Sequence, residues 1–442
     1  MNSTRRTFLK QSLVTTSGAG LAALLPGQLW AAEQQPAASD KLVVGLIGCK
    51  NMGWSNLDDF LKVPGVECAA LSDIDDEWLN KRAADVQERT GKKPKLFKDF
   101  RKLLEQKDID AVIVGTPDHW HCLNMVYACQ AGKDVYVEKP LANSIAECDI
   151  MVRAARKYNR IVQVGQQQRS DNLWRDVINF VHSGKLGKIR RVKVWANFNY
   201  AAGQPIAPDE PVPQGVDFDM WLGPAPARSF NRNRFHGLWR MFWDYGGGLM
   251  TDWGVHLLDM ALWAMNIQGA PKATIGMGGL FAGEGNAVET ADTQNVLYQF
   301  DDFTLEWEHN AGIQTGPNGR IYGITFVGSN GTLWADRDTW EVIAEGWGEN
   351  ARMQTVPQQK SDGQGHLNHV RNFVECVKTR QTPVCDVQVG YDAAFYAHIG
   401  NIAYRTGETL VWDETKKQFS NSPAANKLLT PVYRAPWELP RL

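Results

Sequence analysis

The chain has 442 residues, of which 43% are hydrophobic and 22% charged, and its formal net charge is −2. This composition is typical of a globular protein of two domains. The near-neutral charge argues against a nucleic-acid-binding protein, which needs a basic surface. Beyond the first ~30 residues no apolar stretch reaches membrane-spanning length. The seven cysteines are odd in number and form no C-x-x-C pair, so we expect no disulfide framework.

The N-terminal segment is typical of an export signal. Residues 4–10 form a twin-arginine pattern, and a moderately apolar run follows over residues 12–29. A membrane anchor is the alternative, but glycines and a proline interrupt the run and weaken it. We expect residues 1–32 to be a twin-arginine signal peptide, cleaved or kept as a tether, followed by a linker over 33–40. Because this route exports folded proteins, the predicted location is the periplasm.

From residue 41 to residue 165 apolar strands alternate with amphipathic helical stretches. The predicted strands cover residues 42–47, 66–72, 111–115, 135–137 and 161–164, and helical patterns between them include 77–89 and 123–131. Strands that alternate with helices predict a parallel sheet with right-handed crossovers. We therefore expect an open, doubly wound α/β domain over residues 41–165.

The pattern changes after residue 165. Longer, partly alternating strands are predicted over residues 188–199, 290–299, 303–309 and 321–327, separated by glycine and asparagine turns. They indicate a large, mostly antiparallel sheet with few helices on it. The expected second domain covers residues 166–415, and residues 416–442, rich in Pro, Asn and Lys, are expected to form an extended arm.

A glycine-rich turn ends the first predicted strand. It consists of Gly48, Cys49, Lys50, Asn51, Met52 and Gly53. A dinucleotide fingerprint, G-x-G-x-x-G, lets the backbone approach a pyrophosphate at a helix N-terminus. Lys50 replaces the middle glycine, so the match is imperfect. Asp73 ends the second strand, where a carboxylate would bind the adenosine ribose and repel a 2′-phosphate, which favours NAD over NADP.

Two further motifs follow the third and fourth strands and so face the same edge of the sheet. Lys139, within Glu138-Lys139-Pro140, is expected near the nicotinamide ring. The other motif is Thr116-Pro117-Asp118-His119-Trp120-His121. Its histidines and tryptophan could line the cofactor or pack a loop. No metal-ligand spacing accompanies them, so no metal site is expected.

The third motif, residues 246–256, contains Asp252 and His256 four positions apart, a spacing that places both on one helix face. The pair could be purely structural, buried in the core. In the functional interpretation Asp252 orients His256 and raises its basicity. His256 then takes a hydroxyl proton while a hydride leaves the carbon, and Lys139 polarises the oxygen.

Together, in this order, the motifs resemble the glucose–fructose oxidoreductase / inositol dehydrogenase (Gfo/Idh/MocA) family from about Leu42 to residue 405. The resemblance implies a Rossmann domain, a C-terminal domain whose open sheet often forms the oligomer contact, and catalysis by Lys139, Asp252 and His256. The expected cofactor-binding residues are Gly48, Lys50, Asn51, Met52, Gly53, Asp73, Thr116, Pro117, His119, His121, Glu138 and Lys139. Lys50 departs from the family pattern and affects the details of pyrophosphate binding.

Seventeen tryptophans suit a carbohydrate site, since indoles stack on sugar rings, although core packing accounts for many of them. The candidate substrate residues are Trp120, Arg169, Arg240 and Trp243. The family resemblance implies a sugar, polyol or glycoside as substrate, and a homo-oligomer.

The predicted activity is therefore NAD-dependent oxidoreduction of a carbohydrate hydroxyl. Because the periplasm has no known free nicotinamide pool, we expect the cofactor to be loaded before export and kept during turnover. One alternative is glycoside cleavage by oxidation, elimination, hydration and reduction, but Lys139 favours simple oxidoreduction. Another is a sugar-binding protein without turnover, against which the Lys139, Asp252 and His256 set argues.

Overall fold

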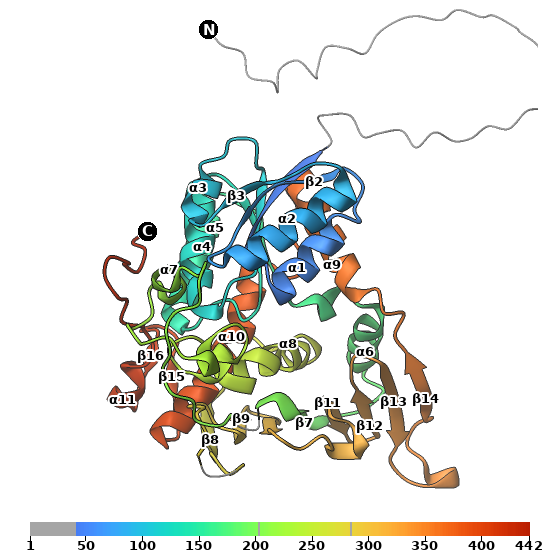
Figure 1. The fold of residues 1–442 in the computed structure, drawn as a ribbon. Coiled ribbons are helices and arrows are strands. Elements are labelled where there is room, and N and C mark those ends of the chain that lie inside the picture. Colours follow the sequence, from blue (N-terminus) through green and yellow to red (C-terminus); the bar gives the residue numbers. More distant parts are fainter. Residues whose placement is uncertain (1–40, 202–203, 283–284) are drawn as a thin grey trace, which may run out of the picture.

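The computed structural model describes residues 41–201, 204–282 and 285–442 (Figure 1). The predicted signal peptide and linker, residues 1–40, lie outside the described residues. Two sheets form the framework, and the chain passes between the two domains more than once (Figure 1).

The N-terminal sheet has six parallel strands in the order β3-β2-β1-β4-β5-β6. The strands are β1 (Leu42–Ile47), β2 (Val66–Ser72), β3 (Lys95–Phe97), β4 (Ala111–Val114), β5 (Asp134–Val137) and β6 (Val162–Val164). The buried apolar runs of β1, β2, β4, β5 and β6 confirm the predicted doubly wound sheet. The short β3 was not expected, because three residues carry too little pattern.

Helices on both faces of this sheet are α1 (Asn51–Phe60), α2 (Asp76–Thr90), α3 (Phe100–Leu104), α4 (Asp118–Gln130) and α5 (Ile145–Lys157). Local chemistry sets their ends. The side chain of Asp75 accepts a hydrogen bond from the Glu77 amide and so caps α2, which ends at Gly91 in a left-handed conformation (φ +71°). Ser144 caps α5 in the same way.

The second sheet has eight strands in the order β14-β13-β12-β11-β7-β10-β9-β8. They are β7 (Ile189–Ala196), β8 (Ala273–Gly279), β9 (Thr293–Gln299), β10 (Thr304–Asn310), β11 (Tyr322–Gly328), β12 (Gly331–Ala335), β13 (Thr339–Ala344) and β14 (Val356–Lys360). All neighbours are antiparallel except β7 and β10, which run parallel. The predicted mostly antiparallel second sheet is therefore confirmed.

Helices cover one face of the second sheet and link it to the first domain (Figure 1). Those packed on the sheet are α6 (Asn172–His182), α8 (Val255–Ala264) and α10 (Val387–Thr406), whereas α7 (Phe218–Leu222) lies against α4 and α9 (Gly365–Thr379) against α1. Helix α10 packs on β8, α8 and α5, and α9 packs on α1, so the last two long helices connect both domains. This packing fixes the cleft between the domains.

The C-terminal segment returns to the N-terminal domain. It contains β15 (Trp412–Asp413), β16 (Gln418–Phe419) and α11 (Pro423–Asn426). Beyond α11 the ring of Trp437 lies edge-on to Trp120, with centroids 4.9 Å apart, and the Tyr433 hydroxyl donates to Glu147 Oε1 (2.5 Å). The end of the chain thus packs against the first turn of α4, which carries Trp120.

All seven cysteines are buried and unpaired. In the part of the chain that the structure describes, no helix combines the length and apolar character that a bilayer crossing requires.

Candidate active site

The glycine turn brings the start of α1 against the end of β4. Gly48 is left-handed (φ +86°), and a Cβ at Gly53 would lie 1.9 Å from the Gly48 carbonyl oxygen. Lys50 keeps an extended conformation (φ −97°), and its ammonium lies 4.5 Å from the centroid of the Trp78 ring. Its side chain therefore points away from the turn. Because no side chain caps α1, the first backbone N–H groups of the helix remain for an anion.

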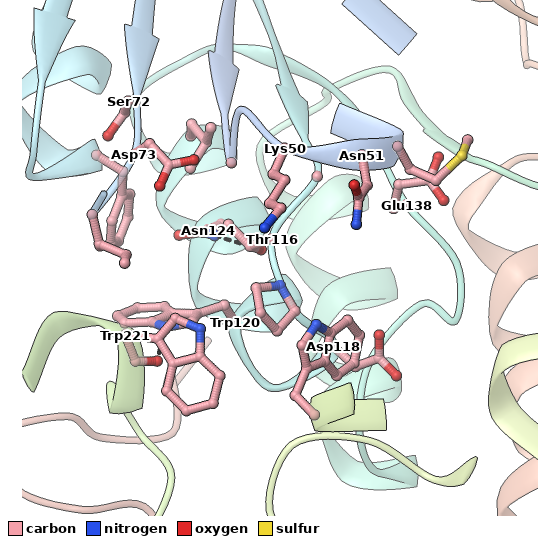
Figure 2. Close-up of a pocket in the computed structure, with 18 of the residues that line it drawn as sticks. Lys50, Asn51, Ser72, Asp73, Thr116, Asp118, Trp120, Asn124, Glu138 and Trp221 are labelled. Atoms are coloured by element: carbon pink, nitrogen blue, oxygen red, sulfur yellow. Dashed lines mark hydrogen bonds between the residues drawn. The ribbon is translucent and has the colours of Figure 1, made fainter. Parts of the chain in front are cut away.

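Asp73 stands at the end of β2 beside this turn (Figure 2). Its carboxylate accepts hydrogen bonds from the backbone amides of Cys49 (2.6 Å) and Asp75 (3.0 Å). Burial raises the pKa of Asp73 to about 6, although those two amides oppose the shift. The position fits a ribose hydroxyl, which would donate to the carboxylate.

One cavity runs along the carboxyl ends of β1, β2, β4 and β5 (Figure 2). The predicted residues that line it are Gly48, Lys50, Asn51, Met52, Asp73, Thr116, Pro117, Trp120, Glu138, Lys139 and Arg240. The second domain closes it with Trp221, His236, Trp239 and Arg240. Gly53 does not line the cavity, but it packs against the backbone of Gly48, which does. The glycine cradle, the uncapped helix and Asp73 together fit a dinucleotide.

The structure corrects the expected roles of His119 and His121. Neither lines the cavity. His119 Nε2 contacts the Trp221 carbonyl (3.0 Å), and the His121 nitrogens contact the carbonyls of Pro140 (2.8 Å) and Thr116 (2.9 Å). Burial lowers the pKa of both rings to about 4, so both are neutral. A neutral ring donates one hydrogen bond, so His121 donates to one of its two carbonyl neighbours and lies between the Thr116 loop and the Lys139 loop.

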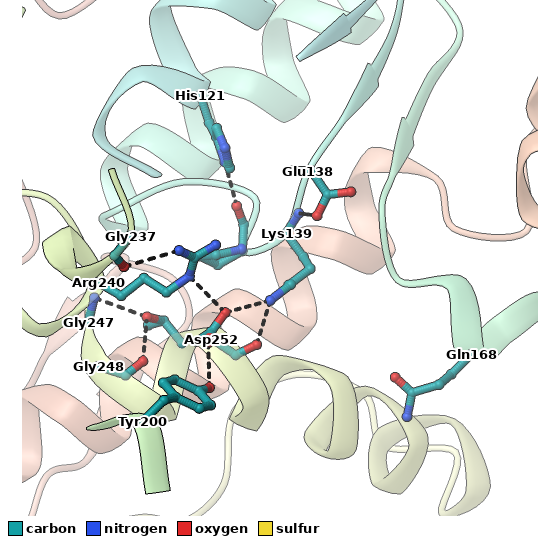
Figure 3. Close-up of polar contacts among 12 residues, drawn as sticks. His121, Glu138, Lys139, Gln168, Tyr200, Gly237, Arg240, Gly247, Gly248 and Asp252 are labelled. Atoms are coloured by element: carbon teal, nitrogen blue, oxygen red, sulfur yellow. Dashed lines mark hydrogen bonds and ion pairs between the residues drawn. The ribbon is translucent and has the colours of Figure 1, made fainter. Parts of the chain in front are cut away.

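Lys139 and Asp252 form the centre of the site (Figure 3). The ammonium of Lys139 donates to Asp252 Oδ1 (2.7 Å) and to the backbone oxygen of the same residue (2.7 Å). Arg240 Nε donates to Oδ1 (3.1 Å), and the Tyr200 hydroxyl donates to Oδ2 (2.7 Å). The carboxylate is therefore held from three directions.

The charges fix the ionisation of this cluster. Burial alone would raise the pKa of Asp252, but the charges of Lys139 and Arg240, with hydrogen bonds from Lys139 and Tyr200, hold it far below its ordinary value. Burial and the Asp252 charge raise the pKa of Tyr200. Asp252 is thus an anion and Tyr200 a neutral donor throughout the working pH range.

The expected Asp252–His256 contact is wrong. A π-helical segment, Met250–Gly254, precedes α8 and changes the angular spacing along the helix. Among the hydrogen bonds of the described residues none joins Asp252 to His256, and His256 Nδ1 is buried without a partner. Burial, with the charges of Arg337 and Lys139, holds the pKa of His256 well below its ordinary value. The ring is therefore neutral, and it is a weaker base than an ordinary histidine, not the stronger base that the sequence predicts.

Two of the four predicted substrate residues lie elsewhere. Nε and Nη2 of Arg169 donate hydrogen bonds to the Asp259 carboxylate (2.7–3.0 Å), so this side chain does not reach the cavity. Trp243 donates to the Glu289 carbonyl (3.1 Å) and lines a separate, small cavity beside α10. An arginine and a tryptophan near a catalytic helix carry no signal that distinguishes a core from a site.

The sequence analysis missed several residues of the site. They are Tyr200, Trp221, Trp239 and His236 and, at a second cavity, Gln168 and Arg337. Trp221 belongs to α7, and Tyr200, His236 and Trp239 come from loops and short turns with no motif of their own. The motif residue Asp118 also lines the cavity, and burial raises its pKa well above the ordinary value. Within residues 41–201, 204–282 and 285–442, no three His, Cys, Asp or Glu side chains are grouped to hold a metal ion.

Comparison with known proteins agrees with this geometry. Residues 42–166 match the Gfo/Idh/MocA oxidoreductase family, NAD-binding Rossmann fold, and residues 173–324 and 352–439 match its C-terminal alpha/beta domain. A glycosyl hydrolase family 109 protein of Saccharopolyspora erythraea is 32% identical over 201 residues, 42% of this chain and 44% of that protein, so the match spans less than half of that relative.

Two full-length similarities accompany that match. Myo-inositol 2-dehydrogenase of Thermotoga maritima is 22% identical over 355 residues, 78% of this chain and 91% of that protein. The crystal structure of aldose-aldose oxidoreductase from Caulobacter crescentus, complexed with glycerol, shares the fold with a TM-score of 0.63 and 20% identity, covering 84% of this chain and 99% of that one. With its NAD-binding Rossmann domain and its C-terminal alpha/beta domain both matched, this chain belongs to the Gfo/Idh/MocA oxidoreductase family.

Proposed function

We propose that the protein is an NAD-dependent oxidoreductase that oxidises a hydroxyl group of a sugar, polyol or glycoside. The observation that carries the proposal is the placement of Lys139 and Arg240, bound to Asp252, in the wall of the dinucleotide cavity. The turn from Gly48 to Gly53 and Asp73 would hold the cofactor, which supplies the hydride acceptor when bound.

The residues of the chain have separable roles in this reaction. Lys139 is placed to donate a hydrogen bond to the substrate oxygen and to favour its alkoxide character. Asp252 holds that ammonium in position, because it accepts from Lys139 on one oxygen and from Tyr200 on the other. His256, which is neutral, is the proton acceptor. Trp221 and Trp239 exclude water from the cleft.

The test is NAD reduction, followed at 340 nm, with a panel of sugars, polyols and glycosides, and identification of the product. A ketone product with one NADH per turnover supports the proposal. No NADH formation with any compound, by a protein that binds NAD and sugar, would favour the sugar-binding protein without turnover.

Glycoside cleavage is the second candidate, because the chain shares 32% identity over 201 residues with a glycosyl hydrolase family 109 protein. Lys139 favours simple oxidoreduction. Nitrophenyl glycosides distinguish the two: cleavage releases nitrophenol without net NADH, whereas oxidoreduction yields NADH and an intact glycosidic bond.

NAD is proposed rather than NADP, because the Asp73 carboxylate would repel a 2′-phosphate. Lys50, Lys81 and Arg82 gather around the Trp78 ring at 4.5, 5.0 and 5.4 Å, so positive charge is also near. Comparing the Kd values of the two nucleotides tests the preference.

Export by the twin-arginine route and a periplasmic location are also proposed, on residues 4–10 and the apolar run that follows. Such a location requires a cofactor that stays bound. Protein purified from the periplasm without added nucleotide should release about one equivalent of NAD(H) on denaturation; an empty protein would contradict the retained cofactor.

A homo-oligomer is proposed through the sheet face opposite the helices. Exposed apolar side chains on this face include Ile275 and Met277 of β8, Leu297 of β9 and Ile343 of β13. Exposed apolar surface of this kind suits a second copy of the chain. Light scattering should give more than one subunit, and Met277→Lys should lower that number.

A further inference from the structure

Arg337 is a half-buried cation without a counter-charge. It lies in the turn between β12 and β13. In the described part of the chain its guanidinium makes a hydrogen bond to Gln168 Oε1 (3.3 Å) and no ion pair, and its Nε is buried without a partner. Arg169, Arg240 and Arg320, which are half-buried as well, each pair with at least one carboxylate. An unpaired guanidinium in such a place is costly unless a ligand completes it.

The neighbouring carboxylates do not complete it. Asp336, the preceding residue, is taken by Arg320 and by the backbone amide of Thr339. Asp338, the following residue, is exposed at the end of the turn. The fold therefore leaves the charge of Arg337 for something outside the chain.

Arg337 is connected to His256 through the ring of Trp253. Its guanidinium carbon is 4.4 Å from the centroid of the Trp253 ring, and that ring is 5.9 Å from the ring of His256. The charge of Arg337 acts on the titration of His256, and that of Asp252 acts on Arg337, so all three lie in one electrostatic neighbourhood.

Gln168 adds a second unpartnered donor. Its Nε2 is buried and makes no hydrogen bond, and in Figure 3 Gln168 lies apart from the Lys139–Asp252 cluster, on a different segment of the chain. Gln168 and Arg337 line one cavity, together with Asp171, Asp338 and His366, and this cavity is separate from the dinucleotide cavity. A buried amide donor and a half-buried guanidinium therefore border the same space.

We propose that Arg337 and Gln168 form a subsite for a carboxylate group, so that the substrate is an acidic sugar, such as a uronic acid or a uronide. This inference rests on the proposed function. A guanidinium and an amide N–H match the planar, singly charged carboxylate. The same cavity is lined by Asp171, Asp338 and Lys360, and its two carboxylates would repel a doubly charged phosphate more strongly than a singly charged carboxylate.

The experiment compares matched acidic and neutral ligands on the enzyme–NADH complex. Calorimetry gives the Kd of D-glucuronate against D-glucose, and of methyl β-D-glucuronide against methyl β-D-glucoside. Wild type should bind each acid about tenfold or more tightly than its neutral partner, as a charge-assisted hydrogen bond implies. Arg337→Met should bring that ratio to about one.

Two further variants keep the test independent of folding. Arg337→Lys retains the charge but not the planar fork, so the acid preference should shrink yet persist. Gln168→Glu supplies an internal carboxylate to Arg337 and should abolish the preference. Equal binding of acids and neutral sugars by wild type, or an unchanged ratio in Arg337→Met, would overturn the subsite.

Failure of the subsite is distinguishable from failure of the proposed function. NAD reduction by neutral sugars without acid preference sinks the subsite and leaves the oxidoreductase intact. Acid-selective binding without NADH formation from any sugar sustains the subsite and sinks the oxidoreductase.

Discussion

The ammonium of Lys139 lies 2.7 Å from Asp252 Oδ1 and 2.7 Å from the backbone oxygen of the same residue. Lys139 follows β5 of the Rossmann domain, and Asp252 belongs to the π-helical segment before α8 of the second domain. The contact therefore joins the cofactor-binding half of the cleft to the half that carries His256.

Replacing Lys139 should abolish hydride transfer but not nucleotide binding. In Lys139→Met the substrate oxygen loses its donor, and kcat/KM should fall at least a hundredfold, on the order of the loss of one oxyanion donor. Stopped-flow absorbance at 340 nm measures the step, and fluorescence titration measures NAD binding. Lys133→Met is the matched control, because Lys133 is also buried and donates only to the backbone oxygens of Gln106 and Ile109. A loss of similar size in the control would contradict the assigned role.

The pH–rate profile should report His256. A proton acceptor must be neutral. Burial and the charges of Arg337 and Lys139 hold the pKa of His256 well below its ordinary value, although the charge of Asp252 acts to raise it. kcat/KM should therefore stay high as the pH falls through 6.5, the ordinary histidine value. Arg337→Met removes one positive charge, which raises the pKa of His256 and moves the acid limb to higher pH. An acid limb at the same pH in both proteins would refute this coupling.

Nucleotide affinity should depend on pH through Asp73. Its pKa is raised to about 6 by burial, and the ionised carboxylate is the better acceptor for a ribose hydroxyl. NAD should bind more tightly as the pH rises from 5 to 7, with a plateau above. Asp73→Asn should bind NAD more weakly at pH 7 and show no such rise. A rise of equal size in this variant would assign the titration to another group.

Acid should destabilise the fold through its buried histidines. Burial lowers the pKa of five of them to about 4: His119, His121, His309, His369 and His398. In the unfolded state these histidines take up protons below pH ~6.5, whereas in the folded state they stay neutral down to about pH 4. Their contribution to the free energy of unfolding is therefore complete above pH ~6.5 and is lost as the pH falls toward 4. The free energy of unfolding in urea should fall by several kcal/mol between pH 7 and 5.

A single replacement checks the histidine account. His398 contacts the Ala142 carbonyl (3.0 Å). His398→Gln should lower the free energy of unfolding at pH 7. The slope of that free energy against pH, which reports the number of protons taken up on unfolding, should fall by up to one proton. His182, which is exposed at the end of α6, offers His182→Gln as the matched replacement outside the core.

Much of the fold could be predicted because buried parallel strands are continuous apolar runs. β1 and β2 begin and end at the predicted residues, Leu42–Ile47 and Val66–Ser72. β14 (Val356–Lys360) was not predicted, since its exposed edge sequence Val-Pro-Gln-Gln-Lys lacks an apolar run. β8 was not predicted either, because three of its seven residues are glycines, which weaken the sequence pattern of a strand.

The site was predicted where a motif directly follows a strand, as with Gly48, Asp73 and Lys139. The site was not predicted where the position of a side chain depends on the type of helix or on loops distant in the sequence. The four-residue spacing of Asp252 and His256 implies a shared face only in a regular α-helix, and a π-helical turn separates them here. Tyr200 reaches Asp252 from a loop that the second sheet positions, a relationship with no local signature.

The most direct measurement of the central claim is isotope transfer from substrate to cofactor. The protein would be mixed with NAD and a sugar carrying deuterium on its carbons, and the nucleotide would be recovered and analysed by mass spectrometry and proton NMR. The account predicts one deuterium on nicotinamide C4 in wild type and none with Lys139→Met under conditions where both bind. Conversion or cleavage of the sugar by wild type with unlabelled nucleotide throughout would contradict it.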